Sequence, residues 1–410
     1  MSDSTSSTQS DSVFPSTRSP GKSRLTFQAA AIAGGWVPLT IAAGQGVALR
    51  MDSLAASAAA YSVLIAAGWG LSMVALPVMG HLGDTVVHRG IDRRILIAVG
   101  GLAMLVCFAV MGMATTVSGF ALMWLLAQFP TALIVTAASS RLANEAPADL
   151  RFWASTAAGV GPVIALMLGA ATTLVLSGVP SVLFIAPAVV GFALLIPSMI
   201  MNPLPVGETA TRLVNRSKRS YPWVFLITIA LAFSGLAVGR IYLVPLIELM
   251  STDLSAERVT ATASITLLVA TFGALIGGLV AGRLMQRGDR HLSIFGWFAL
   301  SSAVPLALLA IASNIEQVFV IGAMLGICLG AVNVSIYGIY INKYSHEVDS
   351  GRTFGLIVAA ETVPYAALPL TAAIFQTATS SALIPILFMC GAMLSIGAGL
   401  LTRFRVRQGR

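Results

Sequence analysis

The sequence predicts an all-α membrane protein in which twelve transmembrane helices form two pseudo-symmetric six-helix bundles. Hydrophobic residues make up 57% of the 410 residues and charged residues only 10%, which is too little charge for the surface of a soluble protein. The apolar residues gather in stretches of about 20 or more, the length that crosses the hydrocarbon core of a bilayer. The basic residues fall in alternate gaps between those stretches, and the two halves of the chain share a loop pattern.

Each apolar stretch is expected to be a helix, because a lipid-facing strand outside a closed barrel leaves its backbone groups unsatisfied. The alternation of about ten residues that is typical of barrel strands is not visible. The expected spans, in order, are 27–49, 57–80, 94–115, 118–140, 152–177, 181–201, 222–248, 259–282, 292–313, 316–342, 353–377 and 381–402.

The distribution of Lys and Arg predicts which side of the membrane each loop faces. Short loops rich in these residues stay in the cytoplasm. Basic positions begin and end the chain and alternate with gaps that hold only Arg50 and Arg258. We therefore expect a multi-pass protein of the inner or plasma membrane with both termini in the cytoplasm. The net charge of +8 then faces an anionic leaflet, and no nucleic-acid partner is expected.

The composition also divides the chain into segments. Residues 1–23 are rich in Ser and Thr without an apolar run, which is typical of a disordered tail. The expected N-terminal six-helix bundle is 24–201, the cytoplasmic linker is 202–221, and the C-terminal six-helix bundle is 222–402. A basic tail, 403–410, ends the chain.

Two loops repeat in the same order in both halves. The loop after the second span is matched after the eighth by Arg287, Gly288, Asp289 and Arg290. Farther on, Glu145, Arg151 and Pro162 are matched by Glu347, Arg352 and Pro364. This indicates an ancient duplication, and paired six-helix repeats are typical of transporters with a solute site at the repeat interface near mid-membrane.

The loop after the second span carries a motif, and with it the chain resembles the major facilitator superfamily over about 24–402. The residues of the motif are Gly80, Gly83, Asp84, Arg89, Gly90, Asp92, Arg93 and Arg94. The long spacing from Asp84 to Arg93 and Arg94 is more similar to the glycoside–pentoside–hexuronide and sucrose symporter branch. In the fifth span, Gly159, Gly161 and Pro162 partly resemble the antiporter motif of drug exporters, so the direction of transport stays open.

Asp84 is expected to act in conformational gating. Its carboxylate, at the cytoplasmic end of the second span, can accept hydrogen bonds from the free N–H groups of a helix N-terminus. The resemblance places the start of the eleventh span there, near Arg352 and Thr353. The contact would stabilise the outward-facing state by about 1–2 kcal/mol. The alternative is that Asp84 only anchors loop charges. The aligned position in the second half is Gly282, so the latch is expected to be one-sided.

Glu361 is the strongest candidate for a transport residue, because a carboxylate about 13 Å into the bilayer is costly unless it is paired or hydrated. That cost favours the protonated form, so Glu361 is expected to carry a proton, with a structural hydrogen bond as the alternative. The other candidates for the solute or proton site are Trp36, Gln128, Asn333, Tyr337 and Tyr365. Asn333, Tyr337, Tyr340 and Tyr344 form one stripe of a helix face. Arg240 either binds an anionic group in the cavity or extends toward the outer interface.

We therefore expect a secondary active transporter that takes up a small polar organic solute by proton symport. Proton-coupled efflux of a hydrophobic compound is the second hypothesis, and a non-transporting receptor or scaffold is the third. Enzyme activity is not expected, nor are a cofactor or a metal, because no ATP-binding loop and no metal-ligand spacing is present. The expected partners are the solute, protons and the lipid bilayer, and the protein is expected to be a monomer.

Overall fold

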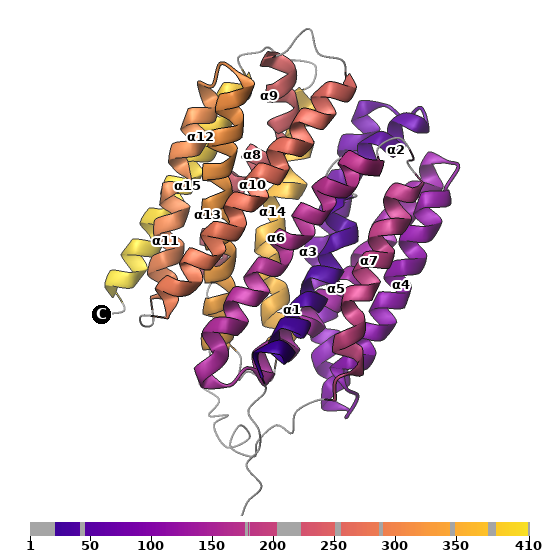
Figure 1. Ribbon diagram of the computed structural model, residues 1–410, viewed down its shortest axis with the longest axis vertical. Coiled ribbons are helices and arrows are strands. Elements are labelled where there is room, and N and C mark those ends of the chain that lie inside the picture. The colour runs from indigo at the N-terminus through magenta and orange to yellow at the C-terminus, as the bar shows by residue number, and fades with distance from the viewer. Residues whose placement is uncertain are drawn as a thin grey trace, which may run out of the picture.

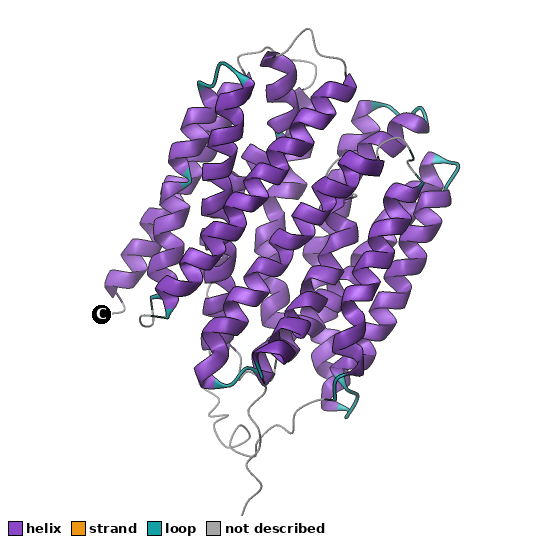
Figure 2. Cartoon of the chain, viewed as in Figure 1, coloured by secondary structure: helices purple, strands orange, loops and turns teal. Residues whose placement is uncertain are grey.

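The computed structural model describes residues 21–41, 46–176, 179, 181–202, 223–250, 256–286, 290–344, 349–375 and 383–408. Within those ranges the chain is helical apart from short turns and contains no strand, which confirms the predicted all-α class (Figure 2). Eleven of the described segments are long and apolar enough to cross a membrane. The chain is therefore a multi-pass membrane protein. The predicted tail up to residue 20 and the linker 203–221 lie outside the described residues.

The helices of the first half account for the first six predicted spans. They are α1 (Lys22–Ile41), α2 (Val47–Ser53), α3 (Ala58–His88), α4 (Arg93–Met113), α5 (Val117–Glu145), the short 3-10 helix η2 (Ala148–Leu150), α6 (Arg151–Leu176) and α7 (Val182–Ile200). The first span comprises α1 and α2, and α1 packs against α5, α6 and α7 inside this half.

The helices of the second half account for the other six predicted spans. They are α8 (Trp223–Ile241), α9 (Leu243–Met250), α10 (Ala256–Met285), α11 (His291–Ser301), α12 (Ala303–Ala310), α13 (Ile315–Tyr344), α14 (Ser350–Phe375) and α15 (Leu383–Gln408). The last helix continues through most of the predicted basic tail, 403–410.

Two of the predicted spans in the second half are broken by a single turn residue. The seventh span breaks at Tyr242 and the ninth at Ser302. A proline follows each break by three residues, namely Pro245 and Pro305. Because the proline ring lacks an N–H and clashes with the carbonyl four residues earlier, each break falls where the helical hydrogen bond is lost.

The two halves gather side by side (Figure 1). They meet where α3 packs along α14 and where α6 packs against α10 and α13. The end at which α1 begins and α3 ends is at the bottom of Figure 1. We call it the basic end, because Arg24 lies in the first turn of α1 and Arg93 and Arg94 begin α4. The other end is called the opposite end.

Candidate functional site

A central cavity of about 100 Å³ lies between the two halves. Helices α1, α3 and α6 of the first half and α8, α13 and α14 of the second half line it. All of the predicted solute-site residues except Gln128 are among its lining residues: Trp36, Arg240, Asn333, Tyr337, Glu361 and Tyr365. Residues from four predicted spans therefore meet at one place in the fold, although they are more than 300 residues apart at the extremes of the sequence.

A second cavity, of about 80 Å³, adjoins the first. The two share Thr40, Leu166, Leu236, Arg240 and Leu329 in their linings. Apart from Arg240, the second cavity is lined by apolar residues, glycines and the hydroxyl residues Thr40, Thr173, Ser264, Thr266 and Thr271. Arg240 is the charged residue common to both cavities.

Glu361 lies in the central cavity without a protein partner. No hydrogen bond or ion pair joins its carboxyl group to any residue in the described part of the chain. Tyr365, one helical turn farther along α14, is its neighbour on that helix. The Tyr365 ring packs against Trp69 of α3, with 5.3 Å between the ring centroids. A carboxyl group in such a place is stabilised by taking up a proton or by binding a ligand.

Arg240 lies over the ring of Tyr365. Its guanidinium carbon is 5.6 Å from the centroid of the Tyr365 ring, a distance at which a cation is attracted to an aromatic face. The sequence left open whether this side chain enters the cavity or extends toward the outer interface. Its place in the lining of both cavities favours the first alternative. The break at Tyr242 directly follows the end of its helix α8.

Other polar groups in the cavity also lack protein partners. The indole N–H of Trp36 is buried and donates to no described atom. Asn333 is 7% exposed, and its side-chain amide makes no hydrogen bond to a described residue. The Tyr337 ring packs against Phe354, with 5.4 Å between centroids. A buried polar group without a partner costs about 1–3 kcal/mol, so a bound solute or water would stabilise these groups.

Gln128 does not line the central cavity. Its side-chain amide donates to the carbonyl of Trp124, one turn earlier on α5, at 3.0 Å, and its carbonyl oxygen is buried without a partner. The indole of Trp124 donates in turn to the carbonyl of Leu64 on α3 at 3.1 Å. Gln128 has the depth of a cavity residue along its helix, but depth does not determine which way a side chain on that helix points.

Asp84 joins the two halves at the basic end. Its buried carboxylate accepts hydrogen bonds from the backbone N–H groups of Gly351, at 3.1 Å, and Arg352, at 2.9 Å. Both N–H groups lie in the first turn of α14 and have no partner within that helix. Arg93 Nη2 lies 2.9 Å from the same carboxylate. The contact has the geometry expected from the sequence, and the helix begins at Ser350.

The backbones of α3 and α14 approach each other closely beside Asp84. A Cβ atom at Gly80 would overlap the carbonyl oxygen of Gly351. Arg93 also donates to Ser350 Oγ at 3.3 Å, and the hydroxyl of Tyr340 on α13 donates to the carbonyl of Ser350 at 3.1 Å. Tyr340 of the predicted stripe therefore belongs to the closure of the basic end, and the side chain of Tyr344 lies outside the described residues.

The rest of the motif shapes the loop between α3 and α4. Gly90 has a φ of +85°, which favours glycine. Asp92 caps α4 by accepting a hydrogen bond from the N–H of Arg94 at 3.0 Å, and it forms an ion pair with the Arg94 side chain at 3.1 Å. Arg89 is an exposed loop residue and Gly83 lies near Leu96. Of the degenerate copy, Arg290 precedes α11 and is exposed, whereas Arg287, Gly288 and Asp289 lie outside the described residues.

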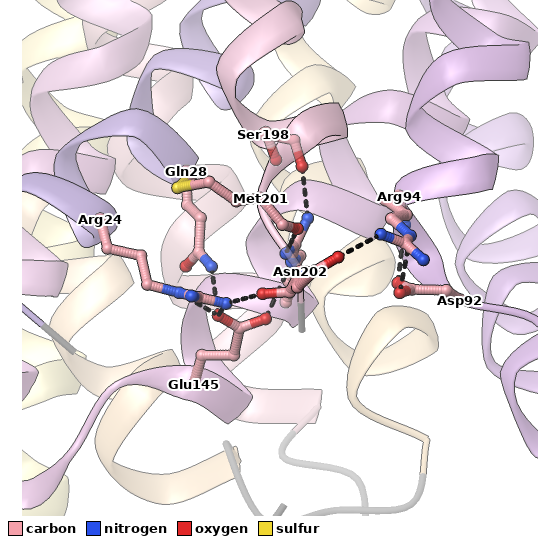
Figure 3. A network of polar contacts seen from close by, with 9 residues as sticks. Arg24, Gln28, Asp92, Arg94, Glu145, Ser198, Met201 and Asn202 are labelled. Carbon is pink, nitrogen blue, oxygen red and sulfur yellow. Dashed lines mark hydrogen bonds and ion pairs between the residues drawn. The ribbon is translucent and has the colours of Figure 1, made fainter. Parts of the chain in front are cut away.

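A polar network at the basic end of the first half was not predicted from the sequence (Figure 3). Glu145, at the end of α5, accepts hydrogen bonds from Arg24, Gln28 and Arg141. Arg141 also donates to the carbonyl of Ser198, in the last turn of α7, and to that of Met201, directly after this helix. Arg24 donates to the carbonyl of Asn202. The four-residue spacing of Arg141 and Glu145 on one helix was the available signal. The network joins α1, α5 and α7.

By sequence, the chain matches no protein-family model and no curated protein. Its fold is similar to that of a solved transporter, the crystal structure of the nucleoside transporter NupG. The match has a TM-score of 0.64 at 13% sequence identity and covers 93% of this chain and 98% of that one. The similarity shows that the two chains share a fold, and it does not support the narrower sucrose symporter branch.

Proposed function

We propose that this protein is a secondary active transporter that moves a small organic solute through the central cavity by alternating access. The observation that carries the proposal is the meeting of Trp36, Asn333, Glu361 and Tyr365 in one cavity between the two halves. A cavity bounded by two separate bundles changes its access when one bundle rocks against the other. The fold shared with a nucleoside transporter is consistent with such a role.

The basic end is proposed to face the cytoplasm, because its loops carry most of the Lys and Arg residues. The contact of Asp84 with the start of α14 would then hold the cytoplasmic side closed. The arrangement described here is accordingly the outward-facing or occluded one. Opening toward the cytoplasm breaks the contact and separates α3 from α14.

Glu361 is proposed to couple transport to protons. An ionised carboxylate inside the membrane is costly unless a counter-ion or water accompanies it, and no described cation is paired with this one. A proton taken up from outside and released inside would supply the driving force for uptake of the solute. The solutes that such a transporter could take up include neutral polar molecules, such as sugars and nucleosides, and small organic acids.

The test is the coupled flux in liposomes that contain the purified protein. Each candidate solute is applied outside, and acidification of the lumen is followed with a trapped pH-sensitive dye. Solute-dependent acidification supports symport, and alkalinisation would support the antiport hypothesis instead. The variant Glu361→Gln is expected to abolish the proton flux. The matched control is Glu316→Gln, an exposed carboxyl at the start of α13, which should behave as the parent protein does.

A further inference from the structure

We propose that the solute is a small organic anion, whose carboxylate or sulfonate binds Arg240 while its body lies against the Trp69 and Tyr365 rings. This assignment rests on the transport function proposed above and makes its substrate class specific.

Arg240 contacts the Tyr365 side chain but has no acidic partner among the described residues. It lines both adjoining cavities, and no carboxylate among the described residues lies within ion-pairing distance, 4.0 Å, of it. By contrast, Arg24, Arg93, Arg94 and Arg141 are each paired with a carboxylate. Guanidinium groups bind carboxylate and other oxyanions through paired N–H donors. An oxyanion on the solute would therefore supply the negative charge that Tyr365, its neutral neighbour, does not.

A purely structural role does not fully explain the position of the Arg240 side chain. The residue lies in the last turn of α8, where a cation interacts favourably with the partial negative charge of a helix C-terminus. That role needs only a positive charge near the helix end. It does not explain why the guanidinium faces the Tyr365 ring and lines two cavities.

The aromatic side chains beside Arg240 form a wall suited to the body of a small solute. Trp69 and Tyr365 pack at an interplanar angle of 35°, and Trp36 brings a third aromatic ring to the cavity with its indole N–H unsatisfied. Flat apolar faces of sugars and aromatic rings pack well on such surfaces. Asn333 and Trp36 offer hydrogen-bonding groups that can fix the orientation of that body.

The charges of the cavity give a reason for coupling. Arg240 and Glu361 line the same cavity, and Tyr365 follows Glu361 by one turn and faces Arg240. When Glu361 is ionised, it repels an anionic solute and weakens the attraction of Arg240. When Glu361 takes up a proton, the cavity is left with one positive charge, and an anion is favoured. By reciprocity, the bound anion strengthens the binding of a proton to Glu361. The anion and the proton therefore enter the cavity together. One anion moved with one proton transfers no net charge.

The test uses two matched series of probes that differ in charge. The sugar series is glucuronate, glucose and glucosamine, and the planar series is benzenesulfonate, benzenesulfonamide and benzylamine, with uridine as a neutral nucleoside. Binding is measured by the shift of the thermal unfolding midpoint in detergent, and transport by the acidification of proteoliposomes. The expected result is that the anionic member binds at least about tenfold more tightly than its neutral and cationic counterparts in one series or both.

Three variants locate the effect. Arg240→Gln is expected to raise the apparent Kd of the anionic probe about tenfold or more, and Arg240→Lys is expected to restore part of the affinity because the positive charge returns. The matched control is Arg403→Gln, because Arg403 also lies over an aromatic ring, Trp297 at 3.7 Å, on helices that do not line the cavity. It should bind the anion as the parent protein does.

Several results would overturn the proposal. One is a preference for glucose, uridine or an amine over the matched anion. Another is anion binding that Arg240→Gln leaves unchanged. In either case proton flux with the preferred solute would leave the transport function intact, so the two proposals fail separately. Binding of the anion with no solute-dependent flux in any series would instead contradict the transport function.

Discussion

The basic end of the first half and the central cavity differ in how they treat charge. At the basic end, Glu145 is held by Arg24, Gln28 and Arg141. In the cavity, Glu361 and Arg240 have no charged partner among the described residues. Pairing compensates the charges of Glu145 and Arg141 and links α1, α5 and α7 of one bundle. Unpaired groups between the bundles are costly in the empty protein, so a proton or solute that satisfies them is bound strongly.

The largest expected effect comes from breaking the paired region. Glu145→Gln removes the charge that compensates the buried Arg141, whose side chain is 3% exposed, and should lower the free energy of unfolding by about 3–5 kcal/mol. The measurement is an unfolding titration in mixed micelles. Asp149→Asn, at an exposed position just beyond the same helix, is the control and should change stability by less than about 0.5 kcal/mol. Glu361→Gln should leave stability equal or higher, and a loss as large as that of Glu145→Gln would contradict the contrast.

Overpacking the contact between the halves should be the next largest effect. In Gly80→Val, the side chain meets the backbone of α14, and the closed arrangement should lose about 1–3 kcal/mol. The population then shifts toward a form open at the basic end. The readout is the distance between spin labels at Arg89→Cys and Lys343→Cys, both exposed positions at that end. Gly70→Val on the same helix has open space around it and should leave the distance distribution unchanged.

Removing the charge of Asp84 should have a smaller effect of the same sign. Asp84→Asn keeps the shape of the side chain but weakens its interaction with the two N–H groups at the start of α14, by about 1–2 kcal/mol. The ratio of open to closed forms at the basic end should rise about five- to thirtyfold, as judged by the same pair of labels. Asp92→Asn weakens a cap within one bundle and serves as the control. An equal shift in both variants would show that Asp84 only anchors the loop.

The smallest loss of stability is expected for the solvent-exposed ion pair at the basic end, between Arg94 and Asp92. The side chain of Arg94 is 37% exposed in its ion pair with Asp92, and exposed pairs contribute less than about 1 kcal/mol. Arg94→Gln should therefore lower stability only slightly in the unfolding titration used for Glu145→Gln. A cost that approaches the Glu145 value would mean that its hydrogen bond to Asn202 is part of the network around Glu145.

Much of this arrangement was predictable from the sequence because its signals are local. Helix length and apolar composition predicted the spans. The resemblance to the major facilitator superfamily, based on the loop motif, implied the contact of Asp84 with the start of the eleventh span. The two helix breaks, at Tyr242 and Ser302, were not predicted. Prolines such as Pro77 and Pro130 lie inside unbroken helices, so a proline alone does not mark a break. Among the cavity residues, position along the helix identified Glu361 and Asn333, because polar groups at that depth are costly.

The remainder depends on how helices are rotated and paired, which a single sequence does not specify. Gln128 lies at the depth of the cavity along α5, but its side chain donates to the Trp124 carbonyl of the same helix and does not line the cavity. Trp69 was not predicted as a cavity residue, because an aromatic side chain in an apolar span does not stand out. Arg141 is within reach of Glu145 on the same helix, but the other two partners, Arg24 and Gln28, lie more than 100 residues away on α1. Nothing local in the sequence indicates that these two meet Glu145.

The most direct test of the central claim is the accessibility of the cavity from the two sides of the membrane. Asn333→Cys is introduced into a variant in which Cys107, Cys328 and Cys390 are replaced by Ser. Its reaction with a membrane-impermeant thiol reagent is then measured in right-side-out and inside-out vesicles. Alternating access predicts reaction from both sides, with Asp84→Asn raising the rate from the cytoplasmic side and lowering it from the other. Reaction from one side only, or rates that Asp84→Asn does not change, would contradict the account.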